Sequence, residues 1–276
     1  MNLQFGLQLY SVRDELQKDY WGTLEKLAAI GYRHLEIANH NADSGLEPNA
    51  TELRKRLDAL GMKVVSSHIH PLDRYEEIIA YNKELGSTAI GLGIAFFKNK
   101  REVLECCELL NRHGEAYKKG GLDFYYHNHF QEFQKFDGEY VLDIILNNTD
   151  KDLVKIEFDT YWAVRGGVDP IAYLKKLGDR CDLVHQKDLP ATAIPANLLE
   201  VTGEDADITF ERFLELQQAD QFSEVGEGTL DIAGIIRTVR EIGAAKYIFV
   251  EQDLTSRNQL ESVEISYRNI SKLFGA

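Results

Sequence analysis

Short apolar runs alternate with segments of helical periodicity along the whole chain. In the longer segments apolar residues recur every three or four positions, which predicts helices with one buried face. The shorter runs are rich in β-branched and aromatic residues, which favour strands. Glycines follow several helical segments, as expected where a left-handed residue turns the chain towards the next strand. These glycines are Gly31, Gly61, Gly86, Gly120 and Gly243.

This alternation predicts eight units, each a strand followed by a helix. Strands are expected at residues 2–10, 33–38, 63–69, 88–92, 123–128, 153–158, 181–186 and 246–251. Helices are expected at 20–30, 50–60, 72–85, 98–119, 138–146, 169–177, 231–242 and 260–273. Strands that alternate with helices pair in parallel through right-handed crossovers. The pattern therefore predicts an α/β fold, a (β/α)8 TIM barrel, with residues 1–276 as a single domain.

A doubly wound open sheet is the competing architecture. That fold normally carries a glycine-rich phosphate loop after its first strand, and residues 8–13 (Gln-Leu-Tyr-Ser-Val-Arg) lack it. One segment departs from the regular alternation, because an extended loop at 189–228 follows the seventh strand and contains a helical stretch at 209–218. Long loops are commonly functional, so we expect this one to lie over the catalytic mouth of the barrel.

Composition and charge narrow the classes of function. The net charge of −14 and the pI of about 5.1 argue against a nucleic-acid partner, which needs clustered lysine and arginine. No apolar run reaches the roughly 18 residues that a membrane span requires, and the first residues alternate apolar and polar rather than forming a signal peptide. Three cysteines without metal or disulfide spacing favour a reducing, cytoplasmic location.

Ionisable and polar residues gather where the predicted strands end. Catalytic groups of a (β/α)8 barrel lie at the C-terminal ends of its strands. The candidates there are Gln8, Glu36, His68, His127, His129, Glu132, Asp159, Trp162, His185, Lys187 and Glu251. A mixed set of Asp, Glu and His suits a divalent ion such as Mn²⁺, Mg²⁺, Co²⁺ or Zn²⁺. Such an ion polarises a carbonyl while a nearby carboxylate removes a proton from the adjacent carbon.

Five motifs follow one another at these strand ends: Tyr126-His-Asn-His-Phe-Gln-Glu-Phe133, Phe158-Asp-Thr-Tyr-Trp162 with Gly167-Val-Asp-Pro170, His185-Gln-Lys-Asp188, Val225-Gly-Glu-Gly228 and Val250-Glu-Gln-Asp253. Together they resemble the xylose isomerase-like TIM barrel family of sugar phosphate isomerases and epimerases. The resemblance covers nearly the whole chain.

The resemblance implies a divalent metal ion held by four ligands from the last four strands, usually Glu, Asp, His and Glu. Mn²⁺ is the first choice among the ions named above. Asp159, His185 and Glu251 match the second, third and fourth ligands. At the first position this chain has His127 in place of the family's glutamate. Three arrangements stay open: His127 binds the metal, Glu132 reaches back from the loop, or the ion keeps three protein ligands and a water.

The resemblance also implies catalytic and substrate-binding roles. Glu251 is expected to act as acid or base, and the second proton-transfer group is open between His127 and Glu132. Lys187 is expected either to pair with Asp188 or to contact a substrate oxyanion. The residues expected to bind substrate are Gln8, Glu36, His68, His129 and Trp162, the last by stacking on a sugar ring.

We therefore expect a metal-dependent sugar isomerase or epimerase that abstracts a proton next to a carbonyl of a sugar, keto-glycoside or inosose. A lyase or dehydratase that performs β-elimination at the same metal site is the first alternative. A metal-free sugar-binding or regulatory barrel is another. An endonuclease acting at abasic sites shares this barrel, but the acidic charge balance disfavours its basic groove. Few lysine or arginine side chains lie at the predicted strand ends, which favours a neutral substrate over a phosphorylated one. The sequence leaves homo-oligomerisation open.

Overall fold

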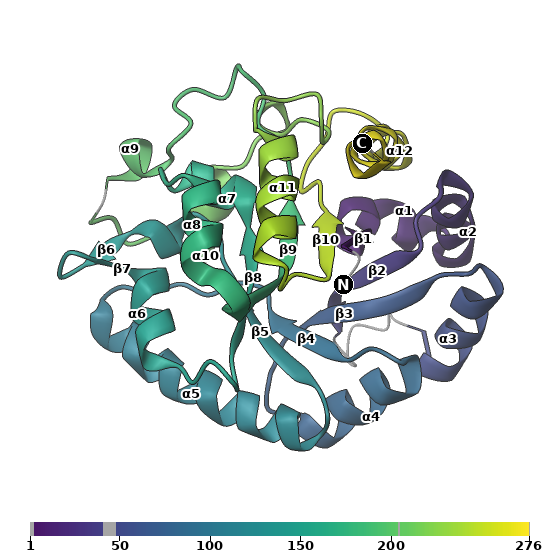
Figure 1. The fold of residues 1–276 in the computed structure, drawn as a ribbon, viewed down its shortest axis with the longest axis horizontal. Coiled ribbons are helices and arrows are strands. Elements are labelled where there is room, and N and C mark those ends of the chain that lie inside the picture. Colours follow the sequence, from purple (N-terminus) through teal and green to yellow (C-terminus); the bar gives the residue numbers. More distant parts are fainter. Residues whose placement is uncertain (1–2, 41–47, 204, 276) are drawn as a thin grey trace.

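The computed structural model describes residues 3–40, 48–203 and 205–275, and its strands close into a parallel barrel (Figure 1). Neighbouring strands follow the order β1, β2, β3, β4, β5, β8, β9, β10, and β10 pairs with β1 to complete the ring. Their bounds are β1 Gln4–Gln8, β2 His34–His40, β3 Lys63–Ile69, β4 Ala89–Leu92, β5 Asp123–His127, β8 Lys155–Asp159, β9 Cys181–Gln186 and β10 Tyr247–Val250. The predicted (β/α)8 barrel is confirmed.

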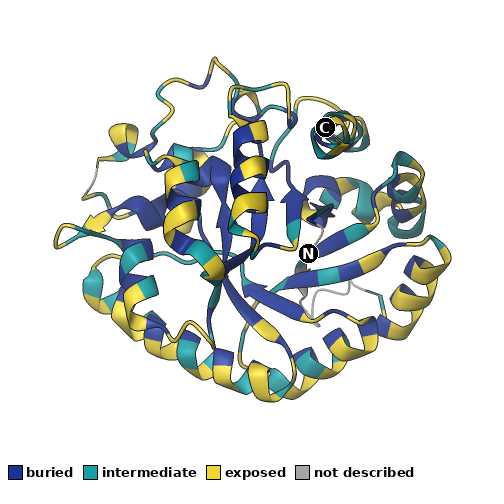
Figure 2. Ribbon diagram, viewed as in Figure 1, coloured by how far each residue is buried: buried dark blue, intermediate teal, exposed yellow. Residues whose placement is uncertain are grey.

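Helices pack around the barrel and turn their buried sides towards the strands (Figure 2). The longer ones are α2 Tyr20–Ile30, α3 Ala50–Ala59, α4 Tyr75–Leu85, α5 Lys100–Lys119, α6 Val141–Asn148, α8 Pro170–Leu177, α11 Ile232–Ile242 and α12 Gln259–Gly275. Each overlaps a predicted helix, because the periodic apolar residues form the face that packs on the sheet. The 3-10 turns are η1 Leu9–Val12, η2 Gln131–Phe133, η3 Gly178–Arg180 and η4 Ala219–Gln221.

Glycine termination follows the expected rule at most helices. Gly86 and Gly243 adopt the left-handed conformation directly after α4 and α11. After α5 the Gly120-Gly121 pair ends the helix as predicted, but the left-handed residue is the second glycine and not the first. Gly120 has a right-handed φ of −75°, and Gly121 is the residue with positive φ. Consecutive glycines leave the sequence free to turn at either position, and the Cβ-free Gly120 also lies against Ile79.

Several short elements were not predicted. Helix α1 (Arg13–Lys18) follows η1, and helix α7 (Thr160–Arg165) begins directly after β8. A small hairpin, β6 (Lys135–Phe136) with β7 (Glu139–Tyr140), follows η2. These elements span too few residues to show a period, although the Asp-Gly pair in the hairpin turn is a common turn sequence. Helix α7 matters for the site because it starts at Asp159.

The segment between β9 and α11 contains helices α9 (Leu199–Thr202) and α10 (Phe210–Glu215), so the predicted helical stretch at 209–218 corresponds to α10. Asp188 fastens the two ends of this segment together. Its carboxylate accepts hydrogen bonds from the backbone N–H groups of Leu189, Gly226, Gly228 and Leu230. A Cβ at Gly228 would come within 2.3 Å of Asp188 Oδ1, so a side chain does not fit there.

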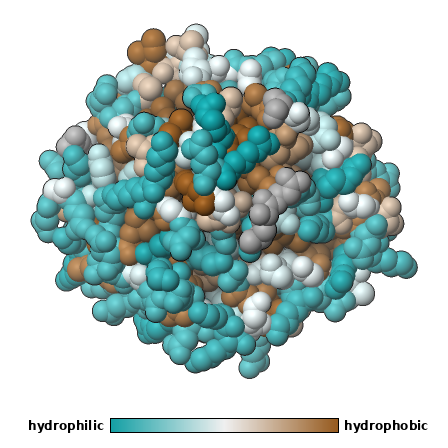
Figure 3. Space-filling model, in the orientation of Figure 1, coloured by the Kyte–Doolittle hydropathy of each residue, from teal (hydrophilic) through white to brown (hydrophobic). Residues whose placement is uncertain are grey.

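Hydrophilic residues dominate the molecular face drawn in Figure 3, with apolar residues showing between them. Among the described residues, no helix has both the length and the apolar sequence that crossing a membrane would require.

Candidate functional site

Four strand ends bring two imidazoles and two carboxylates together. His127 and Asp159 end β5 and β8, His185 lies on β9, and Glu251 follows β10 directly. Each offers one ligand atom, and these four atoms all lie within 4.8 Å of one another. All four residues are buried. The structure therefore places side by side the residues that the sequence proposed as metal ligands, and we call this set the outer cluster.

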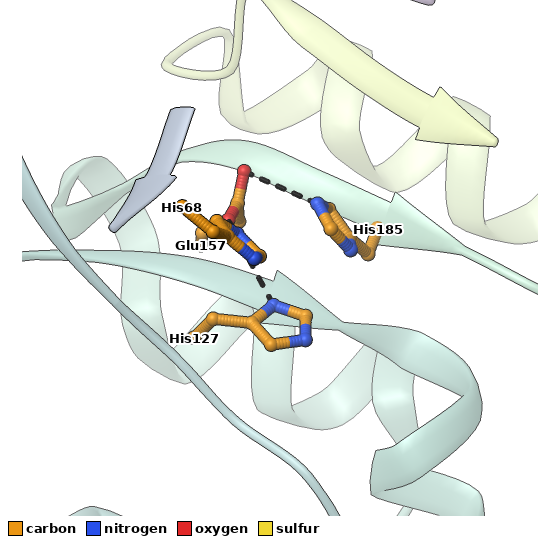
Figure 4. Close-up of side chains that lie close together, drawn as sticks. All are labelled: His68, His127, Glu157 and His185. Atoms are coloured by element: carbon orange, nitrogen blue, oxygen red, sulfur yellow. Dashed lines mark hydrogen bonds and ion pairs between the residues drawn. The ribbon is translucent and has the colours of Figure 1, made fainter. Parts of the chain in front are cut away.

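A second set of ligand atoms, which we call the inner cluster, meets the same distance limit (Figure 4). It consists of His68, His127, Glu157 and His185, so the two clusters share two imidazoles. His68 Nε2 lies 2.6 Å from Glu157 Oε2, and His185 Nε2 lies 3.3 Å from Glu157 Oε1. The rings of His68 and His185 stack with their centroids 5.4 Å apart. Together the clusters form a continuous buried polar network.

Glu157 is a site residue that the sequence analysis missed. It lies in the middle of β8 and is buried. Alternate residues of a strand face the same side, so Glu157 points with Asp159 into the barrel. A charged residue two positions before a candidate ligand, in an otherwise apolar strand, was the pattern that could have identified it.

His185 is held between carboxylates on both sides of its ring. Its Nδ1 lies 2.8 Å from Glu251 Oε2 and its Nε2 lies 2.5 Å from Glu36 Oε2. Burial alone would lower the pKa of His185, but the negative charges of Glu157, Glu36 and Glu251 outweigh it and raise the pKa well above its ordinary value. These carboxylates therefore favour the protonated form of the ring.

Glu36 lies deep in the network and binds several partners. Its carboxylate accepts hydrogen bonds from Gln8 Nε2, at 2.6 Å, and from the Ser66 hydroxyl. Burial, followed by the charge of Glu157, raises the pKa of Glu36. Its position between the ends of β1 and β3 makes it a link between the first strands and His185.

Lys187 binds the outer cluster and not Asp188, so the first of its two expected roles, a pair with its neighbour in sequence, is not found. Its Nζ lies 2.5 Å from Asp159 Oδ2 and 2.6 Å from Glu251 Oε2, with Asp253 Oδ1 at 3.5 Å. Burial would lower the pKa of Lys187, but these carboxylates outweigh it and raise the pKa well above its ordinary value. Asp188 instead fastens the loop after β9.

Glu251 stays ionised within this arrangement. Burial would raise the pKa of its carboxyl, but the charges of Lys187 and His185 outweigh it and hold the pKa well below the ordinary range. Asp253 is further from these cations. Its burial raises the pKa to about 7. The two carboxyl groups at the end of β10 therefore differ in protonation near neutral pH.

His127 is a buried imidazole and His129 is a partly buried one, and both are neutral. Burial lowers the pKa of each well below its ordinary value. Within the described parts of the chain, Nδ1 of each ring has no hydrogen-bond partner. The His127 Nδ1 atom lies 3.8 Å from Glu157 Oε2, beyond hydrogen-bond distance. A neutral imidazole whose nitrogen has no hydrogen-bond partner can coordinate a metal ion or accept a hydrogen bond from a substrate hydroxyl.

Asp159 uses its two oxygens differently. Oδ1 accepts the backbone N–H of Trp162, 2.8 Å away, and so caps helix α7. Oδ2 faces Lys187 in the outer cluster. The backbone N–H of Asp159 donates to Asn128 Oδ1, 3.0 Å away, which ties β8 to the end of β5. The cap therefore fixes the carboxylate in the orientation that presents Oδ2 to the site.

A cavity of about 440 Å³ opens onto these groups. The predicted site residues that line it are Gln8, His68, His127, His129 and Glu251. The predicted site residues outside its lining are Glu36, Glu132, Asp159, Trp162, His185 and Lys187. Tyr10, His70 and Asp253 also line it, and the sequence analysis assigned them no role.

Two of the residues outside the lining support the site from behind. The Trp162 ring is buried and packs on His129, with centroids 5.3 Å apart, rather than lying along the cavity where a sugar would stack. Glu132 accepts hydrogen bonds from the Tyr126 hydroxyl, at 2.7 Å, and from the backbone N–H of His129, at 2.8 Å. Both carboxylate oxygens of Glu132 are thus occupied, and burial raises its pKa to about 7.

Comparison with known proteins identifies relatives across the chain. An inosose dehydratase from Clostridium beijerinckii is 29% identical over 266 residues, which cover 86% of this chain and 84% of that enzyme. The inosose dehydratase from Clostridium perfringens is 27% identical over 214 residues, and the match spans 65% of that enzyme's length. A sugar phosphate isomerase/epimerase structure from Parabacteroides distasonis is 26% identical, with a TM-score of 0.75 and coverage of 97% and 93% of the two chains.

A family comparison agrees with the fold. The matching family is described as xylose isomerase-like TIM barrel, and the match runs over residues 24–268, from within α2 into α12. The match thus includes β2 to β10 and the four residues of the outer cluster. This chain belongs to the xylose isomerase-like TIM barrel family.

Proposed function

We propose that this protein is a divalent-metal-dependent enzyme that removes a proton next to the carbonyl of a neutral keto-sugar or inosose. One observation carries the proposal: His127, Asp159, His185 and Glu251 direct ligand atoms to within 4.8 Å of one another at the C-terminal end of the barrel. Active sites of (β/α)8 enzymes lie at that end. The cavity that contains His127 and Glu251 gives a small molecule access to them.

The residues of the outer cluster fit a divalent ion. Two imidazoles and two carboxylates form a mixed nitrogen and oxygen set suited to Mn²⁺, Co²⁺ or Zn²⁺, and we propose Mn²⁺ first. His127 is neutral and its Nδ1 is unsatisfied among the described residues, so this ring is ready to act as a ligand. When bound, the ion would polarise the substrate carbonyl and so acidify the neighbouring C–H group.

Two residues are placed to move protons. Glu251 is ionised and lines the cavity, so it can accept a proton from the substrate carbon. Lys187 is protonated and lies 2.6 Å from Glu251, outside the cavity lining, so it can supply a proton to the cavity by way of Glu251. We assign Glu132 a positioning role, because its carboxylate holds the His129 backbone and the Tyr126 hydroxyl.

Dehydration is the second candidate function. Proton removal followed by return to the same carbon gives epimerisation, whereas loss of a β-hydroxyl gives elimination. Elimination needs an acid at the leaving oxygen, and Lys187 is a protonated group beside the base. The inosose dehydratases that align with 84% and 65% of their own length support this alternative.

Proton exchange in D₂O tests the proposal directly. The protein is stripped of metal, supplied with Mn²⁺, and incubated with inososes, ketohexoses and keto-glycosides while NMR follows the C–H signal next to each carbonyl. We expect deuterium incorporation for the true substrate class, with loss of water if the reaction is an elimination. A sample that binds Mn²⁺ but exchanges no proton in any compound contradicts the proposal. A sample without affinity for Mn²⁺ favours a metal-free binding protein.

A matched pair of variants distinguishes loss of the proposed metal site from a general loss of stability. Asp159→Asn removes a buried carboxylate 2.5 Å from Lys187 at the C-terminal end of the barrel. Asp182→Asn removes a buried carboxylate 2.8 Å from Lys155, where β8 and β9 begin. We expect only the first variant to lose Mn²⁺ binding and exchange.

A further inference from the structure

Helix α10 contributes apolar side chains to the cavity that contains the proposed catalytic groups. Phe210, Phe213 and Leu214 line the same 440 Å³ space as His127 and Glu251. Residues 210 and 214 are one helical turn apart, so they share a face of the helix. The helix belongs to the loop after β9, which is separate in sequence from the strands that supply the acids and bases.

Phe210 and Leu214 are the exposed part of this surface. They are 49% and 48% exposed, whereas Phe213 is 4% exposed. Phe213 packs on His129 and Trp162, with centroid distances of 5.0 Å and 5.4 Å. The buried phenylalanine therefore fixes the helix against the barrel while its two neighbours remain available to a ligand.

Further residues extend the apolar character of this side of the cavity. Phe96 lies beside the helix, with its ring centroid 6.1 Å from that of Phe210 and 5.8 Å from that of Phe213. Leu92 and Ile94, from the end of β4 and the loop after it, line the cavity as well. Hydroxyl groups placed against such a wall would lose hydrogen bonds to water without replacement, which is costly.

The cavity also has room for more than a sugar ring at the metal cluster. Pockets of roughly 300–1,000 Å³ accommodate drug-sized ligands, and this cavity of about 440 Å³ falls in that range. Its polar groups, which include His68, His127 and Glu251, suit a hydroxylated ring. The lining from α10 suits an apolar group attached to that ring.

We propose that the substrate is a keto-sugar bearing an apolar substituent, such as an aryl or alkyl aglycone, which contacts Phe210 and Leu214 on α10. This inference rests on the proposed function for the location of the sugar. The aryl or alkyl group contributes binding through burial of apolar surface, and α10 thereby determines specificity. Continuity with the catalytic cavity distinguishes this surface from other exposed apolar residues, such as Val201 and Ile194, which do not line it.

A binding experiment that needs no turnover tests the inference. Titration calorimetry on the Mn²⁺-supplemented protein compares phenyl and methyl glycosides of the same unoxidised sugar. We expect the phenyl compound to bind about tenfold more tightly, a ratio typical of one well-placed apolar group. Phe210→Ser and Leu214→Ser should each reduce that ratio severalfold. Both residues are half exposed, so the variants are expected to fold, and circular dichroism checks this.

Two exposed apolar residues on the same loop provide matched controls. Val201 is 49% exposed and Ile194 is 85% exposed, and both lie outside the cavity lining. Val201→Ser and Ile194→Ser should keep the wild-type preference for the phenyl glycoside. Equal affinity of the wild type for both glycosides overturns the inference. An equal preference in all four variants also overturns it, because the phenyl group would then bind elsewhere.

The outcomes also separate this inference from the proposed function. Proton exchange on a keto-sugar without any preference for a phenyl group would leave the proposed reaction intact and remove the apolar subsite. A phenyl preference that depends on Phe210 and Leu214, in a protein that exchanges no proton, would keep the apolar subsite and remove the proposed reaction. Sedimentation velocity gives a third result. An oligomer that dissociates in Phe210→Ser, with unchanged ligand preference, would make α10 a contact between copies of the chain and overturn the inference.

Discussion

His185 Nε2 lies 2.5 Å from Glu36 Oε2, and this contact decides which side of the imidazole faces the proposed metal site. With its Nε2–H donated to Glu36, the ring directs Nδ1 towards Glu251. A carboxylate behind a metal-binding histidine typically fixes its tautomer and raises its basicity. Gln8 and Ser66 hold Glu36 in turn. The orientation of His185, the proposed ligand on β9, thus depends on strands from the opposite end of the sequence.

Replacement of Glu36 is therefore expected to weaken metal binding without removing a ligand. Glu36→Gln should raise the dissociation constant for Mn²⁺ by roughly 10–100-fold, the usual effect of losing such a partner. Titration calorimetry measures this constant. Glu52→Gln, on the exposed face of α3 and paired with Arg56, is the control and should bind as the wild type does. Unchanged affinity in Glu36→Gln would show that His185 needs no carboxylate behind it.

Lys187 supplies a positive charge at the point where a metal would bind. In Lys187→Met, the carboxylates of Asp159 and Glu251 lose the ammonium group that lies 2.5–2.6 Å away. Removing one partner of a buried ion pair costs about 3–5 kcal/mol, so the metal-free variant should unfold at a lower temperature than the wild type. Mn²⁺ should restore more stability to the variant than to the wild type, because it replaces the missing charge. Thermal unfolding with and without Mn²⁺ measures both effects.

Lys155→Met is the control for this comparison. Lys155 pairs with Asp123 and Asp182, at 3.0 Å and 2.8 Å, at the N-terminal ends of β8, β5 and β9, whereas the outer cluster lies at the C-terminal ends. This variant should lose stability equally with and without Mn²⁺. A Lys187→Met protein that gains no extra stability from Mn²⁺ would mean that the ion binds away from Asp159 and Glu251.

Metal binding is expected to release protons and to strengthen as pH rises. The pKa of His185 in the metal-free protein is well above its ordinary value, because neighbouring carboxylates outweigh burial. The charged ring therefore stabilises the metal-free protein fully below pH 6.5, and this stabilisation is lost as pH rises through the folded-state pKa. A metal ion needs the neutral ring. Calorimetry in buffers of different ionisation enthalpy counts the released protons, and His185→Gln should release fewer.

Glu132 should make the stability of the protein fall between acid and neutral pH. Burial raises its pKa from 4.5 to about 7, so the folded state favours the protonated form. This contribution is complete below pH 4.5 and is lost as pH rises through about 7. The shift corresponds to roughly 3 kcal/mol. Urea unfolding from pH 4.5 to 8 should show a smaller loss in Glu132→Gln than in the wild type. Parallel curves for the two proteins would contradict the assignment.

The sequence predicts the barrel well because the patterns that indicate each strand and helix lie within a few neighbouring residues. Periodic apolar faces and terminal glycines determine each helix, and Asp159, His185 and Glu251 stand out as polar residues at the ends of apolar strands. Glu157 was missed because a carboxylate in the middle of a strand is normally excluded from a core. Lys187 was paired with Asp188 by adjacency, whereas strand alternation points the two side chains apart. The apolar wall of α10 depends on how a long loop folds back, which no local pattern specifies.

Asp188 has a consequence for how the proposed active site can vary. One carboxylate binds backbone N–H groups at both ends of the loop that carries α10. Asp188 therefore joins the point where the loop leaves the barrel to the point where the loop returns. A loop from a relative, transplanted between Leu189 and Gly226, is therefore expected to alter ligand choice while the proposed cation-binding groups stay in place, provided that it restores the contacts of Arg165 with Pro195 and Gln221.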